Sequence, residues 1–110
     1  MPTNQKRTVE SRRLDLHEDL CKILGSRNVY YDPPENIKIK YQAIVYSRAN
    51  IDTTKADNAN YLTTVVYNAT YIRKDDNDDI LEQIIDRPYT QMGTHFVASN
   101  MHHDPFTIYI

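Results

Sequence analysis

The stretch from Tyr61 to Lys74, YLTTVVYNATYIRK, constrains the fold of this chain more than any other. It contains no Gly or Pro, and it is rich in Val, Ile, Thr and Tyr, which fit a pleated, half-buried surface. One face, read at a period of two, is aromatic and apolar and consists of Val65, Tyr67, Ala69 and Tyr71. The pattern predicts a strand of about 40 Å. A strand of that length must overhang a small domain or be supported by another subunit.

Length, composition and charge limit the number of domains and the kinds of partner that the chain can have. A chain of 110 residues with 40% hydrophobic residues is one folded domain by size. A net charge of −2 does not predict a general polyanion-binding surface. Nine Tyr residues suit surfaces that become buried on assembly, because each has a large apolar body and a polar tip. We expect neither a signal peptide nor a membrane span, and we expect the chain to be intracellular when made.

An apolar stripe predicts a helix over Leu14–Gly25, with Ser11 placed to cap its start and Gly25 to end it in a left-handed conformation. The stripe recurs at helical spacing and consists of Leu16, Leu20, Ile23 and Leu24. We expect it to pack on the covered face of the long strand. The single cysteine, Cys21, lies on the same side and is expected to be a buried structural thiol. Residues 1–12 are expected to form a flexible arm, and residues 13–110 a single domain.

An acidic cluster precedes a second helix and consists of Asp75, Asp76, Asp78 and Asp79. Four acids so close together could hold a cation, but carboxylates at a helix start also favour the macrodipole and cap free N–H groups. We therefore expect a helix start and no metal. The apolar stripe that follows consists of Ile80, Leu81, Ile84 and Ile85, and the helix is expected to stop at Arg87-Pro88.

Four further segments have strand character. Val29–Tyr31, closed by two prolines, predicts an edge strand or a turn, and Ile37–Ser47 predicts a second long strand. Thr94–Ser99 and Phe106–Ile110 predict two closing strands around a turn at 100–105, which is rich in Asn, Asp and Pro.

The polar segment Arg48–Asn60 is expected to be a long contact loop between the two long strands, since long loops in compact domains are often functional. The order is then helix, short strand, two long strands, helix and two short strands. This order predicts an α+β fold, with an antiparallel sheet of four to five strands, two of them long and central, flanked by two helices.

The sequence offers little chemistry. Two glycines and no Gly-rich loop exclude a phosphate cradle of the usual kind. His17 and Cys21 are one helical turn apart without a third group at motif spacing. The segment with His95, His102, His103 and Asp104 is the nearest approach to a metal site. Adjacent histidines on an extended segment point to opposite sides, so we expect surface histidines. We expect no catalytic, cofactor-binding or metal-ligating residues.

Several segments together resemble small tail-completion proteins of long-tailed bacteriophages over residues 12–110. They are DLCKIL, NVYYDPP, YQAIVYSRANIDTTKADNANYLTTVVYNATYI, DDILEQIID and PYTQMGTHFVASN followed by NMHHDPFTIYI. No segment is a catalytic fingerprint, so the resemblance lies in the order of the predicted elements and in the kinds of residues they contain. The chain departs from some members in its strongly polar 48–60 segment.

The resemblance implies a tail terminator, a structural virion protein in the tail or neck that assembles in the host cytoplasm. Such a subunit forms a ring, usually a hexamer, on the head-proximal end of the tail tube, where it stops tube growth. Its partners are other copies of itself, the tail tube protein and the head connector. No membrane and no sequence-specific nucleic acid is expected, although genome DNA passes through such a ring. We expect subunit or tube contacts at Tyr46, Arg48, Asp52, Lys55, Asp57 and Tyr61.

Three alternatives stay open. A head-completion or connector protein of the phage neck uses a similar α+β subunit in a ring. A small metal-dependent nuclease would take its ligands from the 75–79 acids and the histidines. A monomeric adaptor would bind a peptide at a sheet edge.

Overall fold

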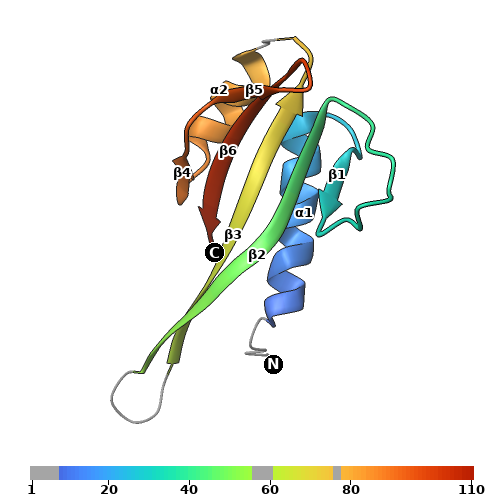
Figure 1. Ribbon diagram of the computed structural model, residues 1–110. Helices are drawn as coiled ribbons and strands as arrows, with labels where there is room; N and C mark the ends of the chain where they lie inside the picture. The colour runs from blue at the N-terminus through green and yellow to red at the C-terminus, as the bar shows by residue number, and fades with distance from the viewer. Residues whose placement is uncertain (1–7, 56–60, 76–77) are drawn as a thin grey trace.

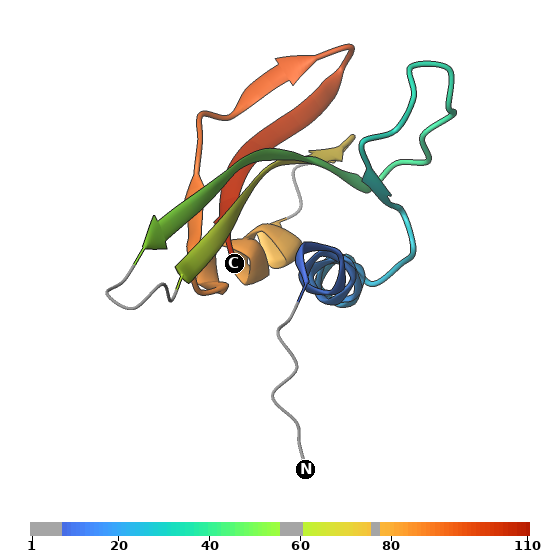
Figure 2. The ribbon, with the colours of Figure 1, turned by 90° about the horizontal axis from the view of Figure 1, so that it is seen from below.

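The computed structural model describes residues 8–55, 61–75 and 78–110 and contains an open sheet with two helices on one face (Figures 1 and 2). In chain order the elements are α1 (Val9–Leu24), β1 (Val29–Tyr31), β2 (Ala43–Lys55), β3 (Tyr61–Arg73), α2 (Asp78–Asp86), β4 (Thr90–Met92), β5 (Phe96–Ala98) and β6 (Met101–Tyr109). The α+β class and the two flanking helices are as predicted.

The sheet differs from the prediction in two ways: it has six strands, and it is mixed. The strand order is β1-β2-β3-β6-β4, and β5 pairs with β6 farther along the same edge. All pairs are antiparallel except β1 with β2, which is parallel. The expectation of a purely antiparallel sheet was wrong because the connection over residues 32–42 carries the chain back to the start of the sheet before β2 begins. Such a return connection makes the flanking strands parallel.

The long strand predicted at Tyr61–Lys74 is present as β3, with 13 residues. The face predicted to be covered is covered: the side chains of Val65, Tyr67, Ala69 and Tyr71 are buried. They belong to one core cluster with Leu16, Leu20 and Leu24 of α1, while Ile23 packs at its margin. The expected packing of the helix stripe on this face of the sheet is therefore confirmed.

Helix α1 begins at Val9, earlier than the predicted Leu14. Thr8, not Ser11, is the N-cap, and its hydroxyl accepts a hydrogen bond from the Ser11 N–H at 3.0 Å. Gly25 ends the helix as predicted, with φ of 77° and its N–H donating to the Cys21 carbonyl. Cys21 is buried, and burial raises the pKa of its thiol, as expected for a structural residue.

Helix α2 ends at Asp86, immediately before the predicted stop. Ile84 is fully buried and Ile80 packs on the core, but Ile85 is exposed. Ile85 was wrongly placed on the buried stripe, because this short helix presents only a narrow line of side chains to the sheet. Asp78 and Asp79 lie in the first turn of α2, where carboxylates were expected, and Asp76 lies outside the described residues.

Two strand boundaries were wrong. Residues 37–42 form no strand, and β2 instead runs from Ala43 to Lys55, into the segment expected to be a loop. Residues 101–105 of the predicted turn lie within β6, and the turn itself consists of Ser99 and Asn100, which have φ of 52° and 62°. Two consecutive positive φ values are characteristic of a tight hairpin turn.

Pro105 has no backbone N–H to donate, and it is tolerated within β6 because neither β4 nor β5 pairs with β6 at this position. Strands β4 and β5 pair with β6 on either side of this position. The Pro105 carbonyl accepts a hydrogen bond from the Gly93 N–H at 2.7 Å. A Cβ added to Gly93 would lie 3.2 Å from that carbonyl oxygen, so this close approach favours glycine.

Candidate functional site

The far halves of β2 and β3 form a two-stranded ribbon that extends past the helices and the rest of the sheet (Figure 1). We call it the β2–β3 arm and define it as residues 48–55 of β2 and 61–64 of β3. From Asn50 onward its register is continuous to the pair Lys55–Tyr61. Strand β1 reaches only Tyr46, and the β3–β6 ladder starts at Val66. Within the described chain, the arm therefore has no third strand along either edge.

The free edge of β2 exposes backbone hydrogen-bonding groups. Val65 exchanges both of its backbone hydrogen bonds with Ile110, on the side away from β2. Its partner across the ladder is Ile51, so Ile51 and Val65 form a non-hydrogen-bonded pair. Hydrogen-bonded and non-hydrogen-bonded pairs alternate along an antiparallel ladder, so Thr53 and Thr63 also form a non-hydrogen-bonded pair. The N–H groups of Ile51 and Thr53 consequently point outward, where a further strand would pair.

A β-bulge separates the arm from the body of the sheet. The β2–β3 register shifts between Arg48 and Asn50, so that one extra residue is accommodated on β2. Before the shift Tyr46 shares the inner face with Ala69, and after it Ile51 shares that face with Val65. Bulges of this kind increase the local twist and bend the strand. The bulge therefore sets the direction in which the arm leaves the sheet.

The root of the arm is fastened to α1. The Arg12 guanidinium donates to the Thr63 carbonyl at 2.8 Å and so occupies part of the β3 edge. Next to it the Arg13 guanidinium lies 4.3 Å from the centre of the Tyr31 ring, a cation–π geometry. Tyr31 also belongs to an aromatic cluster with Tyr46 and Tyr67, with ring centroids 5.0 to 6.3 Å apart. The root of the arm is therefore joined to α1 and lies beside an aromatic cluster.

Tyr46 was predicted as a contact residue, and this placement was wrong. Its side chain is buried in the core, and its hydroxyl lies 2.8 Å from His17 Nδ1 and accepts from Arg13 at 3.4 Å. Burial raises the pKa of the Tyr46 hydroxyl. Burial, and then the Arg13 charge, lower the pKa of His17. The hydroxyl that suggested a surface role is thus satisfied inside the protein.

The other predicted contact residues gather on the arm, as far as the structure describes them. Arg48 and Asp52 are exposed, and Asp52 accepts a hydrogen bond from Asn50 at 2.7 Å. Lys55 and Tyr61 are paired at the ends of the two strands, with side chains outside the described set. Asp57 lies outside the described residues. The neighbouring Ile51, which the prediction omitted, is an exposed apolar side chain on the same strand.

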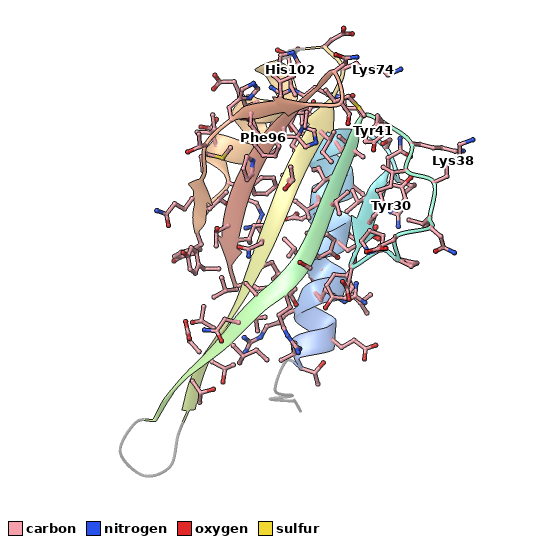
Figure 3. All side chains as sticks on the ribbon, viewed as in Figure 1. Tyr30, Lys38, Tyr41, Lys74, Phe96 and His102 are labelled. Atoms are coloured by element: carbon pink, nitrogen blue, oxygen red, sulfur yellow. The ribbon has the colours of Figure 1, made fainter. Side chains whose placement is uncertain are left out.

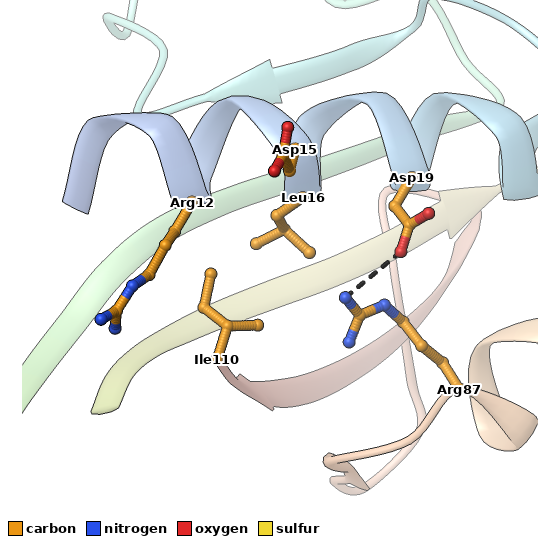
Figure 4. Close-up of a pocket in the computed structure, with 6 residues that line it drawn as sticks. All are labelled: Arg12, Asp15, Leu16, Asp19, Arg87 and Ile110. Atoms are coloured by element: carbon orange, nitrogen blue, oxygen red, sulfur yellow. Dashed lines mark ion pairs between the residues drawn. The ribbon is translucent and has the colours of Figure 1, made fainter. Parts of the chain in front are cut away.

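A shallow hollow of about 330 Å³ lies beside the root of the arm, between α1 and the end of the chain (Figure 4). Leu16 and Ile110 form its apolar floor. The guanidinium groups of Arg12 and Arg87 stand on either side, and Arg87 pairs with Asp19 at 3.3 Å. Its mixed charges and apolar floor suit contact with another protein surface better than chemistry on a small substrate.

A polar cluster lies at the opposite end of the sheet from the arm, where Figure 3 labels His102. The Arg73 guanidinium donates to the Asp104 carboxylate, and both side chains are buried, at 2% and 9% exposure. The other Asp104 oxygen lies 3.1 Å from His95 Nδ1, and His95 Nε2 lies 3.2 Å from His102 Nδ1. The sequence pointed to His95, His102 and Asp104 as the nearest approach to a metal site, but it did not predict their contact with Arg73, which depends on the register between β3 and β6.

His102 and His103 point to opposite faces, as adjacent residues on a strand must. His103 stacks on Phe96, with ring centroids 4.6 Å apart. Among the residues described, no group of three or more His, Cys, Asp or Glu side chains is arranged to hold a metal ion.

Comparison with known proteins adds no family: no protein-family model matches the chain, and no curated protein sequence matches it significantly. In the described portion, no helix is both long and apolar enough to cross a membrane.

Proposed function

We propose that the protein is a structural subunit of a phage tail, a terminator that forms a ring at the head-proximal end of the tail tube. Its partners are then further copies of itself, the tail tube protein and the head connector. The resemblance of residues 12–110 to tail-completion proteins supports this function. The α+β sheet with helices on one face is compatible with it.

The β2–β3 arm is the observation that carries the proposal. A two-stranded ribbon is at best marginally stable in water without a further strand or a packed face. The arm contributes little to the core of its own chain, since residues 48 to 53 are exposed. Its outward N–H groups and the exposed Ile51 favour contact with a neighbouring protein surface.

A closed ring provides such a neighbour for every subunit. Head-to-tail contacts between different surfaces close into a ring when the rotation between subunits fits, and they form a filament when it does not. The arm would cover an edge of the next subunit, leaving the ring's faces to meet the tube and the connector. A ring that matches the tube end but offers no copy of the tube's growing surface stops its growth.

Mass measurement tests the proposal directly. Purified, tag-free protein is analysed by light scattering and by electron microscopy, alone and with tail tube protein. We expect rings, or a concentration-dependent oligomer that becomes a ring on tube ends. In a reconstituted assembly, omission of the protein should give tails of abnormal length. Tails of normal length without the protein would contradict the terminator function.

The outward N–H groups of the arm also favour a second candidate, a monomeric adaptor that adds a partner's peptide to its sheet edge. The same mass measurement separates the two functions. A protein that stays monomeric at high concentration and with tube protein present would favour the adaptor.

A further inference from the structure

Two imidazole rings stand against each other at the β5–β6 hairpin. His95 immediately precedes β5, and His102 lies on β6. His95 Nε2 and His102 Nδ1 are 3.2 Å apart, and the two ring centroids are 5.2 Å apart. His95 is partly exposed, at 42%, so the pair is accessible to a small ion from solvent.

The buried ion pair fixes the orientation of the first ring. Asp104 pairs with the Arg73 guanidinium and is therefore an acceptor for its other neighbour, His95 Nδ1, at 3.1 Å. The hydrogen of His95 is then on Nδ1, and its Nε2 presents a lone pair toward His102. A carboxylate that holds one imidazole nitrogen while the other is left for a ligand is the usual support of a metal-binding histidine.

We propose that His95 and His102 form a two-histidine site for a divalent transition metal such as Zn²⁺. Zinc binds imidazole nitrogen at about 2.0–2.1 Å with tetrahedral geometry, which sets two nitrogen ligands about 3.3 Å apart. The two nitrogens are already separated by nearly that distance. The metal replaces the hydrogen shared by the rings and lies to one side of the line that joins the two nitrogens, with His102 in the tautomer that carries its hydrogen on Nε2.

The site is open, because two protein ligands leave the remaining positions to water or to another molecule. Imidazole ligands favour Zn²⁺, Ni²⁺ and Cu²⁺ over Mg²⁺ and Ca²⁺, which prefer oxygen. The tight turn at Ser99 and Asn100 and the pairing of β5 with β6 bring the two residues together, and the Asp104 contact orients the His95 ring. Such preorganisation favours binding, since little side-chain freedom is lost.

Calorimetric titration of tag-free protein with Zn²⁺ tests the site. We expect saturable one-to-one binding in the micromolar range and no binding of Mg²⁺ at the same concentrations. The H102Q variant should weaken Zn²⁺ binding by at least the about 10–100-fold typical of removing a supporting partner. The matched control is H103Q, which alters the adjacent ring on the opposite face and should leave the affinity unchanged.

A second readout protects the test against a folding defect in the variant. In NMR spectra of the unaltered protein, Zn²⁺ should shift the ring resonances of His95 and His102 and leave those of His17 and His103 in place. Absence of saturable binding, equal affinity in H102Q and the unaltered protein, or shifts confined to the other two histidines would each overturn the site.

Discussion

The two halves of the β2–β3 pair have similar backbone geometry and opposite surroundings. In the body of the sheet, β3 lies between β2 and β6, and its inner face is buried under the helices. In the arm, the same two strands continue to pair beyond the bulge, with exposed side chains on β2 and, within the described chain, no third strand. The first half contributes to the core of the domain, and the second half leaves its β2 side chains exposed.

This contrast shows that strand formation and strand burial are separate properties. β2 extends through a polar segment because β3 offers it a ladder to pair with, although its side chains gain little by burial. We therefore expect substitutions in the body to alter the free energy of unfolding, and substitutions in the arm to alter assembly.

The largest loss of stability should follow removal of the buried Asp104 carboxylate, at the end of the sheet opposite the arm. Asp104→Ala leaves the buried Arg73 guanidinium without this partner, and breaking a buried pair typically costs about 3–5 kcal/mol. Urea unfolding monitored by circular dichroism measures the loss. Glu18→Ala is the control: it breaks the exposed pair with Arg27 and should leave the unfolding midpoint unchanged. An equal loss of unfolding free energy in the two variants would contradict the expected difference between a buried and an exposed ion pair.

Leu20→Ala should produce the next loss, about 2–5 kcal/mol, because the side chain is fully buried between α1 and the sheet. Leu14→Ala, on the same helix but half exposed, should cost well under 1 kcal/mol. The same urea titration compares them. A loss below 1 kcal/mol for Leu20→Ala would mean that α1 does not cover this face.

A smaller, pH-dependent effect is expected at the root of the arm. The pKa of His17 is lowered in the folded protein from its ordinary value of 6.5, mainly by burial and then by Arg13. The unfolded chain therefore binds more protons in this range, and stability falls as the pH drops below about 6.5. His17→Gln should flatten that part of the profile of unfolding free energy against pH. An unchanged slope would show that other groups dominate it.

The smallest effect on stability is expected within the arm. Asp52→Ala removes an exposed side chain that contacts Asn50, and surface changes of this kind usually stay within about 0.5 kcal/mol. Thermal unfolding at a concentration where the protein is monomeric is the appropriate measurement. A loss above 1 kcal/mol would mean that the arm is part of the cooperative core.

The sequence predicted those parts of the fold that depend on local patterns. The unbroken run of β3 and the leucine stripe of α1 have one clear periodicity each, so their buried faces were predicted correctly. The arm half of β2 was not, because Asn, Asp and Thr are typical of loops, and its strand form depends on pairing with β3. Pro105 suggested a turn because proline usually interrupts a strand. The gap in the ladder that admits it lies between β4 and β5, and the sequence alone does not show that these strands pair with β6.

The candidate sites show the same limit. Arg48 and Asp52 were placed on a contact segment from polarity alone, and they lie on the arm. Tyr46 was misassigned because its position in the sequence does not show that its hydroxyl contacts His17 and Arg13 of α1. The Arg73–Asp104–His95–His102 cluster combines residues from β3, β6 and the segment before β5, and only the tertiary register brings them together. The closeness of His95, His102 and Asp104 in the sequence was a local signal for the cluster, but it could not show which side chains meet.

The central claim is that the free edge of the arm serves assembly and not folding, and Thr53→Pro tests it most directly. The Thr53 N–H points away from β3, so proline removes an outward donor and leaves the β2–β3 ladder intact. Thr53→Val keeps the N–H and is the matched control. Light scattering should find rings or oligomers for the unaltered protein and Thr53→Val, and a folded monomer with unchanged unfolding for Thr53→Pro. Full assembly of Thr53→Pro, or a strictly monomeric unaltered protein, would contradict the claim.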